Sequence, residues 1–388
     1  MLKFYLLLAI YIALPLTQAA RLLITGVDGW DDSNIRLLFK LLDRTTDHEL
    51  ILCAPEQATQ GGLRRFGPNN NIDVPDNELM SDDGSLWSDG DSLLSEVSLP
   101  DKPRPIFDDD IENDSLPKKL WDPIADRERF EQHSAHWKWG FDPSDFRLNY
   151  VPSGFTGMRI AIDRAVEYLT PVLYQHRDSD PPLPSPPELP RIYPDLLLVG
   201  PMIGDTLGHN RFDYTGTIIR SYAKDGHPII SFAGPTGSHF NPDRPNEHRE
   251  WSKIYAQLAK HITETVIKSR KPYLPEGTYL NVNFPYIDFV NQRCSNVRDF
   301  KFILTSHFRG DSGVLSYMHC GQWGFPFETE VVDRDDGCYV AITLGRSPSD
   351  WFGSEKPGVF DRQDVIGRLK PILECLPKNQ PLATEKSR

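Results

Sequence analysis

Arg21-Leu-Leu-Ile-Thr-Gly26 is the first regular pattern of this chain, and Val27-Asp28-Gly29 follows it directly. The segment is short and mainly apolar, which predicts a buried strand. A helix is predicted next, because Asp31-Asp32-Ser33 offers N-cap residues and apolar residues then recur at helical spacing as Ile35, Leu38, Phe39 and Leu42. His48-Glu-Leu-Ile-Leu-Cys53 is a second apolar strand pattern. Two apolar strands joined by a helix predict a βαβ unit in a parallel sheet that is covered on both faces.

Strand and helix patterns continue to alternate further along the chain. Strands are predicted at residues 195–199 and 227–232, and helices at 157–169, from about 215, and at 251–269. These patterns predict an α/β fold, a Rossmann-like, doubly wound and mostly parallel sheet from Arg21 to about Ser269. We expect a β-rich C-terminal extension to follow it.

Two stretches interrupt this alternation. Residues from about 67 to 145 are rich in Asp, Ser, Pro and Gly, and the part from Asn71 to Asp114 carries 14 Asp/Glu against Lys102 and Arg104, a net charge of 2 − 14 = −12. Such a composition predicts an insertion without a fixed fold. A second, proline-rich insertion is predicted at about 177–194. Residues 21–388 are therefore expected to form one domain with two insertions.

The net charge of the whole chain is −13, which argues against a nucleic-acid partner because such proteins carry a basic surface. Lys3 precedes an apolar run from Phe4 to Leu16, with small residues near Ala20. This pattern predicts a secretory signal peptide at residues 1–20. The alternative is an N-terminal membrane anchor, but the run is shorter than the roughly 20 residues that a span needs. We expect a secreted, extracellular protein without a membrane partner.

Five cysteines lie beyond residue 20, and four of them fall in the last hundred residues: Cys294, Cys320, Cys338 and Cys375. In an oxidising compartment two disulfides among these four are the simplest arrangement. Pairing of sequence neighbours predicts Cys294 with Cys320 and Cys338 with Cys375. Cys53 lies within an apolar strand pattern and is expected to be a buried thiol. Asn113-Asp114-Ser115 is a candidate glycosylation site at Asn113.

Three strand ends offer candidate functional residues, because ligands of open parallel sheets bind beyond the carboxyl ends of the strands. The first strand ends at Asp28, a carboxylate that either caps the next helix or binds a cation. The second ends in residues 54–62. The third runs into Gly200, Gly204 and Gly208, whose backbone amides could approach an anion or simply form a turn.

Together and in this order, six blocks resemble the SurE family of phosphatases and nucleotidases, in the form of its exported fungal acid phosphatases. The blocks are residues 22–36, Ala54-Pro55 to Gln60-Gly61, Gly200-Pro201 to Gly208, Thr215-Gly216-Thr217, Leu274 to Asn281-Val-Asn283-Phe-Pro285, and residues 337–342. The resemblance implies a metal-dependent phosphomonoesterase whose partner is a small phosphate ester. It also implies a homo-oligomer in which the C-terminal extension is exchanged between subunits.

The resemblance further implies that a divalent Mg²⁺ or Mn²⁺ ion polarises the phosphoryl group and activates water. The family's four ligand positions fall on Val27, Asp28, Gln60 and Met202. Asp28 and the Gln60 carbonyl could bind a metal, and a one-residue slip would bring in Thr59 instead of Gln60. Val27 and Met202 supply no oxygen, whereas these ions prefer oxygen ligands. Asp28 is also the candidate catalytic residue.

Phosphate-facing positions differ less from the family pattern. Gly204, Gly208, Thr215, Gly216 and Thr217 are the candidate phosphate-binding residues.

Two functions follow from these observations. The first is a SurE-like acid phosphatase or 5′-nucleotidase with a remodelled site. The second is a secreted, non-catalytic protein that keeps the fold for binding or assembly. A rebuilt site could recruit oxygen or nitrogen ligands elsewhere, at Asp31, Asp32, Asp205 or His209. A further cluster by sequence, which a solvated loop also explains, is His239, Asp243, Glu247 and His248.

Overall fold

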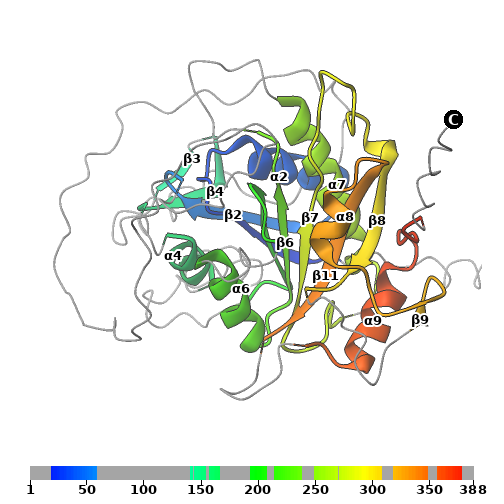
Figure 1. The fold of residues 1–388 in the computed structure, drawn as a ribbon. Coiled ribbons are helices and arrows are strands. Elements are labelled where there is room, and N and C mark those ends of the chain that lie inside the picture. Colours follow the sequence, from blue (N-terminus) through cyan, green and yellow to red (C-terminus); the bar gives the residue numbers. More distant parts are fainter. Residues whose placement is uncertain are drawn as a thin grey trace, which may run out of the picture.

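The computed structural model describes residues 19–58, 140–142, 144–153, 157–166, 193–207, 214–237, 249–269, 271–307, 318–347 and 356–377. In this part of the chain one nine-stranded sheet forms the centre of the molecule (Figure 1). In sheet order its strands are β3 (Gly140–Asp142), β4 (Asp145–Val151), β2 (Glu49–Pro55), β1 (Arg21–Thr25), β5 (Leu196–Ile203), β6 (Ile229–Gly234), β7 (Thr278–Asn283), β11 (Cys338–Arg346) and β8 (Phe300–Thr305). A small second sheet pairs β9 (Met318–His319) with β10 (Gln322–Trp323).

Helices cover both faces of the large sheet. They are α2 (Ser33–Thr45), α4 (Gly157–Arg164), α6 (Tyr214–Lys224), α7 (Arg249–Ile267), α8 (Glu328–Val332) and α9 (Val359–Leu369), with the 3-10 turn η4 (Val297–Asp299). Helices α2, α7 and α9 share one hydrophobic cluster with the sheet, and α4 and α6 share another on the opposite face (Figure 1). Leu22 and Ile24 of β1 face the first cluster and Leu23 faces the second, because successive strand residues point to opposite faces.

The predicted α/β class with a mostly parallel sheet is confirmed. Strand β1 pairs in parallel with β2 on one side and with β5 on the other, and β6 and β7 continue the parallel order. Helix α2 begins directly after Asp32, whose side chain accepts a hydrogen bond from the backbone N–H of Asn34 at 2.8 Å. The sequence pattern at 21–53 thus folds as the βαβ unit that it predicts.

The C-terminal part continues the same sheet. Strand β11 pairs antiparallel with β7, and β8 pairs in parallel with β11. Tyr339 and Ala341 of β11 pack with Val331 and Val332 of α8 in a third hydrophobic cluster. The longer strands of the predicted β-rich extension, β7, β11 and β8, therefore form one edge of the central sheet.

The far end of the predicted acidic insertion, about 67–145, overlaps strand β3, which pairs with β4 and through it with β2. A buried ion pair that sequence spacing does not reveal also lies here, because Asp142 of β3 binds Arg36 of α2 at 2.8 Å. Residues 67–139, Asn113, most of the proline-rich insertion and residues 1–18 lie outside the described residues. No helix in the described part is long and apolar enough to cross a membrane.

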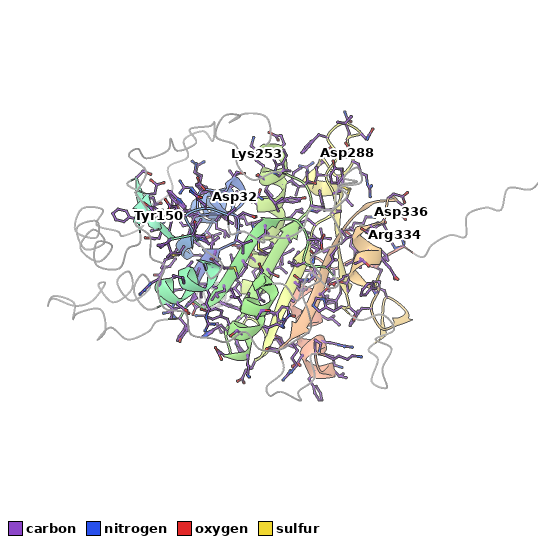
Figure 2. The ribbon with its side chains drawn as sticks, turned by 60° about the vertical axis from the view of Figure 1, so that its left-hand side comes forward. Asp32, Tyr150, Lys253, Asp288, Arg334 and Asp336 are labelled. Atoms are coloured by element: carbon purple, nitrogen blue, oxygen red, sulfur yellow. A yellow bond between two sulfur atoms is a disulfide. The ribbon has the colours of Figure 1, made fainter. Side chains whose placement is uncertain are left out.

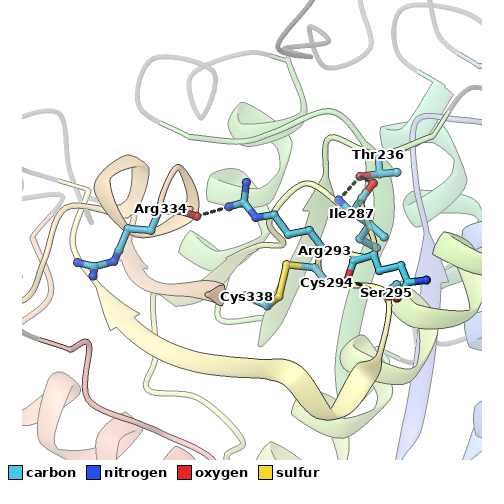
Figure 3. Close-up of a disulfide and its surroundings, with 8 residues drawn as sticks. Thr236, Ile287, Arg293, Cys294, Ser295, Arg334 and Cys338 are labelled. Carbon is cyan, nitrogen blue, oxygen red and sulfur yellow. Dashed lines mark hydrogen bonds between the residues drawn. A yellow bond between two sulfur atoms is a disulfide. The ribbon is translucent and has the colours of Figure 1, made fainter. Parts of the chain in front are cut away.

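The structure pairs Cys294 with Cys338 (Figure 3) and Cys320 with Cys375, so the predicted pairing of sequence neighbours is wrong. Sheet register is the reason. Cys338 stands opposite Phe300 in the β11–β8 pair, which places the loop before β8 beside the start of β11. Beside Cys294, the Arg293 guanidinium donates a hydrogen bond to the carbonyl oxygen of Arg334 (Figure 3). Cys53 is a free, buried thiol, and its burial raises its pKa.

Replacing Cys294 and Cys338 together with alanine should lower the free energy of unfolding by about 4 kcal/mol, because the bond closes a long loop in the unfolded chain. The two cysteines are 44 residues apart in the sequence. The measurement is the urea midpoint of the variant against that of the native chain, both without reductant. Equal midpoints would contradict a stabilising bond at this pair. So would a fall of the midpoint on addition of dithiothreitol that is as large for the variant as for the native chain.

Candidate functional site

The parallel strands β1, β5, β6 and β7 all end at one edge of the sheet. The loops that follow them therefore lie together, which is where open α/β sheets place ligand sites. We call this edge, formed by residues 26–32, 203–207, 234–237 and Asn283, the strand-end site.

Asp28 lies at this site as the sequence predicts. Its side chain is buried, with 7% exposed, and its Oδ2 accepts a hydrogen bond from the backbone N–H of Ile203 at 2.7 Å. The carboxylate thus joins the loop after β1 to the end of β5. This contact gives Asp28 a positioning role in the fold, in addition to any role toward a ligand.

Two more carboxylates of the same loop lie near Asp28. Asp32 (Figure 2) caps α2 and is 2% exposed. Burial, followed by the neighbouring Asp28 charge, raises the pKa of Asp32 well above its ordinary value, and Asp31 adds to this shift while the Asn34 amide opposes it. A carboxyl group with a raised pKa beside a second carboxylate is a common feature of acid–base sites.

Strand β5 extends further than the sequence predicts. The pattern predicts a turn from Gly200, whereas β5 continues to Ile203 with a register shift against β6 between Val199 and Met202. Gly200 has a φ of 95°, and a Cβ there would lie 2.3 Å from the carbonyl oxygen of Phe232. Only glycine fits this position, because its conformation and the contact both exclude a side chain.

The extension of the sheet also engages Gly204, a predicted phosphate-binding residue. Its backbone N–H donates to the carbonyl oxygen of Gly234 at 2.9 Å. The amide that could have faced an anion is thus used to join β5 and β6. Gly208 lies outside the described residues.

Val27 and Met202, at two of the positions where the sequence resemblance implies metal ligands, are core residues. They are 1% and 0% exposed and pack in the hydrophobic cluster beneath α4 and α6. Gln60 lies outside the described residues. Within the described ranges, no group of three or more His, Cys, Asp or Glu side chains is arranged to hold a metal ion. The described donor set, with one oxygen of Asp28 on the Ile203 amide, does not fit the divalent cation that the resemblance implies.

A buried polar network holds the loop after β5. Thr206 donates from its backbone N–H to Asn283 Oδ1 at 2.8 Å and from its hydroxyl to Asn281 Oδ1 at 2.6 Å. Asn281 Nδ2 returns a hydrogen bond to the carbonyl oxygen of Thr206, and the Ser231 hydroxyl also donates to Asn281. Sequence reasoning missed this network. The available signal was Asn281-Val-Asn283, since two amides two residues apart lie on one face of a strand.

The remaining candidates have different surroundings. Thr215 and Gly216, in the first turn of α6, are buried, and Thr217 is exposed with its hydroxyl accepting from Arg220 at 3.3 Å. Asp205 is 8% exposed and its Oδ1 accepts from the backbone N–H of Leu207. His209 and the cluster at 239–248 lie outside the described residues.

Comparison with known proteins gives one kind of match. No protein-family model and no curated protein matches the chain. Among solved structures, the crystal structure of SurE protein from Aquifex aeolicus is similar with a TM-score of 0.40 and 15% sequence identity, over 90% of this chain and 99% of that chain. An identity this low says nothing about the chemistry of the strand-end site.

Proposed function

We propose that this protein is an exported, SurE-like α/β protein that acts in binding or assembly and has no metal-dependent phosphomonoesterase activity. The proposal includes export and self-association, as the sequence resemblance implies. Two disulfides are consistent with an oxidising compartment. The observation that carries the proposal is the burial of Val27 and Met202 in the apolar cluster beneath α4 and α6.

The burial of Val27 and Met202 matters because a substitution at either position would not place an oxygen ligand in the strand-end site. If these two positions faced the strand-end site, a single substitution could restore an oxygen ligand. Both side chains instead pack against neighbours such as Met158 and Ile162 of α4, so the backbone directs them away from water. The changes at the ligand positions are thus part of the core packing, and the fold is kept while the cation's ligands are lost.

We expect purified mature protein to show no Mg²⁺- or Mn²⁺-stimulated hydrolysis of p-nitrophenyl phosphate or nucleoside monophosphates. The loss of one carboxylate ligand alone weakens metal binding by about 4 kcal/mol at an effective dielectric of about 20, which is roughly a thousandfold in affinity. The measurements are calorimetric titration with Mn²⁺ and phosphate release. Metal-stimulated turnover that disappears in Asp28→Asn would show that the family's centre works with fewer ligands, and would refute the proposal.

A second candidate is a hydrolase with a rebuilt carboxylate site, and the raised pKa of Asp32 beside Asp28 favours it. The same assay separates the two functions. Turnover that survives Asp28→Asn but is lost in Asp32→Asn or Asp205→Asn would establish the rebuilt site. Sedimentation velocity on the same sample tests self-association, for which a monomer at all concentrations would be the contrary result.

A further inference from the structure

A groove with a volume of about 970 Å³ runs between the second half of α7, the start of β8 and the residues around the end of α9. Its walls come from residues 257–269 on one side and from 297–302 and 367–374 on the other. No residue of the strand-end site lines it. The groove is therefore separate from the candidate site, and its volume is typical of ligand-binding clefts.

Three basic side chains of this groove make no close ion pair, although Lys260 and Lys268 both help to lower the pKa of Glu264, which lies four residues from each of them on α7. Lys260 is half-buried and Lys268 and Arg298 are exposed, and the described part of the chain offers none of the three an ion pair within 4 Å. These lysines also act on a neighbouring group. The pKa of His261 is lowered first by burial and then by the charges of Lys268 and Lys260. A cationic groove on a chain with a net charge of −13 points to an anionic ligand.

Three other charged residues line the groove, and two of them have a charged partner. Arg368 binds Asp364 at 2.6 Å and donates to the Ser269 hydroxyl. Glu264 binds His48 at 3.2 Å. Glu374 is exposed at the rim. With Arg368 paired to Asp364, the lining residues Lys260, Lys268 and Arg298 remain against two carboxylates, a balance of 3 − 2 = +1.

The floor of the groove is apolar. Phe300 and Phe302, which are 5% and 7% exposed, line the groove together with the half-buried Val297 and Ile372. The His261 ring lies 5.6 Å from the ring of Phe302. A uniformly charged polyanion would leave this surface without contacts, whereas a peptide with apolar side chains between its carboxylates would cover it.

From these features we propose that the groove binds an extended acidic peptide of a partner protein. Lys260 and Lys268 are eight residues apart on α7, about 12 Å along the helix axis. An extended peptide rises about 3.4 Å per residue, so carboxylates three or four residues apart reach both lysines. The apolar residues between them contact the phenylalanine floor. This site is independent of the strand-end site and of any phosphate chemistry.

The test is fluorescence anisotropy of full-length mature protein with a labelled synthetic peptide that carries aspartate at about every fourth position and leucine or phenylalanine between. We expect saturable binding that weakens as salt rises, because the rim contacts are exposed charges. Lys260→Glu with Lys268→Glu should lower the affinity by roughly tenfold or more. Thermal unfolding of the variant confirms that it is folded.

The matched control is Lys224→Glu on α6 with Lys253→Glu at the other end of α7 (Figure 2 labels Lys253), which makes the same change of net charge. It should bind the peptide as the native chain does. The proposal fails if the native chain shows no saturable binding or if both double variants lose affinity equally. It also fails if a peptide with serine in place of the apolar residues, or polyphosphate, binds as tightly, because the groove would then recognise charge alone.

Discussion

Replacing Asp142 with alanine should lower the free energy of unfolding by about 3–5 kcal/mol, because it leaves the buried Arg36 guanidinium without its counter-charge. The two side chains are 7% and 9% exposed and lie 2.8 Å apart. The same contact joins β3 to α2, so its loss should also loosen the edge of the sheet. Arg36 lies 5.1 Å from the ring of Trp30, a contact too weak to replace the lost charge.

The control for this prediction is Glu250→Ala. Glu250 pairs with Lys253 at 3.0 Å on the exposed side of α7, and losing such a pair changes stability by about 1 kcal/mol or less. Replacing Arg36 and Asp142 together with leucine should recover much of the loss, since no buried charge is then left alone. Urea midpoints measure all three variants. An Asp142→Ala midpoint that equals that of Glu250→Ala would contradict the assigned role.

The pH dependence of this contact has a defined sign. Burial raises the pKa of Asp142, but hydrogen bonds from Ser144 and Arg36 outweigh it and lower that pKa below its ordinary value. A carboxyl with a lowered folded pKa stabilises the protein above its unfolded pKa of about 4, and this stabilisation is lost as the pH falls through the folded value. The difference between native chain and Asp142→Ala should therefore be constant near neutral pH and shrink in acid.

The second large effect is expected for Val27→Asp. Introducing the aspartate that the sequence resemblance implies at this position should destabilise the protein by roughly 3 kcal/mol or more, because the carboxylate would be buried among apolar side chains without a partner. Val27 is 1% exposed in the cluster that contains Met202 and Ile162. The combined variant Val27→Asp, Gln60→Ser and Met202→Asn should lose further stability before it gains a metal site.

Val27→Asn separates the effect of charge from that of polarity, because asparagine has nearly the same size as aspartate but no charge. It should lower the free energy of unfolding less than Val27→Asp does. The decisive measurement is the urea midpoint with and without Mn²⁺, because a ligand that binds only the folded state raises stability by mass action. If Mn²⁺ restored Val27→Asp to native stability, residue 27 would face a cation site, and the core position assigned to it would be wrong.

Local sequence patterns predict much of the fold. The apolar runs of β1 and β2 and the periodic residues of α2 predicted the βαβ unit, because burial of a strand or helix face imposes a repeat on neighbouring residues. Asp28 lies beyond the end of β1 for the same reason, since a carboxylate that follows a buried strand lies at the edge of the sheet.

Contacts between distant segments were decided only in the tertiary structure. Pairing of Cys294 with Cys338 follows from the register of β8 and β11. Strand β3 pairs with β4, and Asp142 at its end binds Arg36 across 106 residues of sequence. The continuation of β5 past Gly200 depends on its pairing with β6, which uses the Gly204 amide.

For the strand-end site too, the sequence determines some features and the tertiary structure decides others. The sequence alone determined which residue types stand at the family's ligand positions, and hence that Val27 and Met202 bring no oxygen. Only the tertiary structure decided that both side chains pack beneath α4 and α6, while Asp28 binds the amide of Ile203. The physical reason is that chemical identity is a property of each residue, whereas the direction of a side chain depends on backbone pairing between strands far apart in the chain.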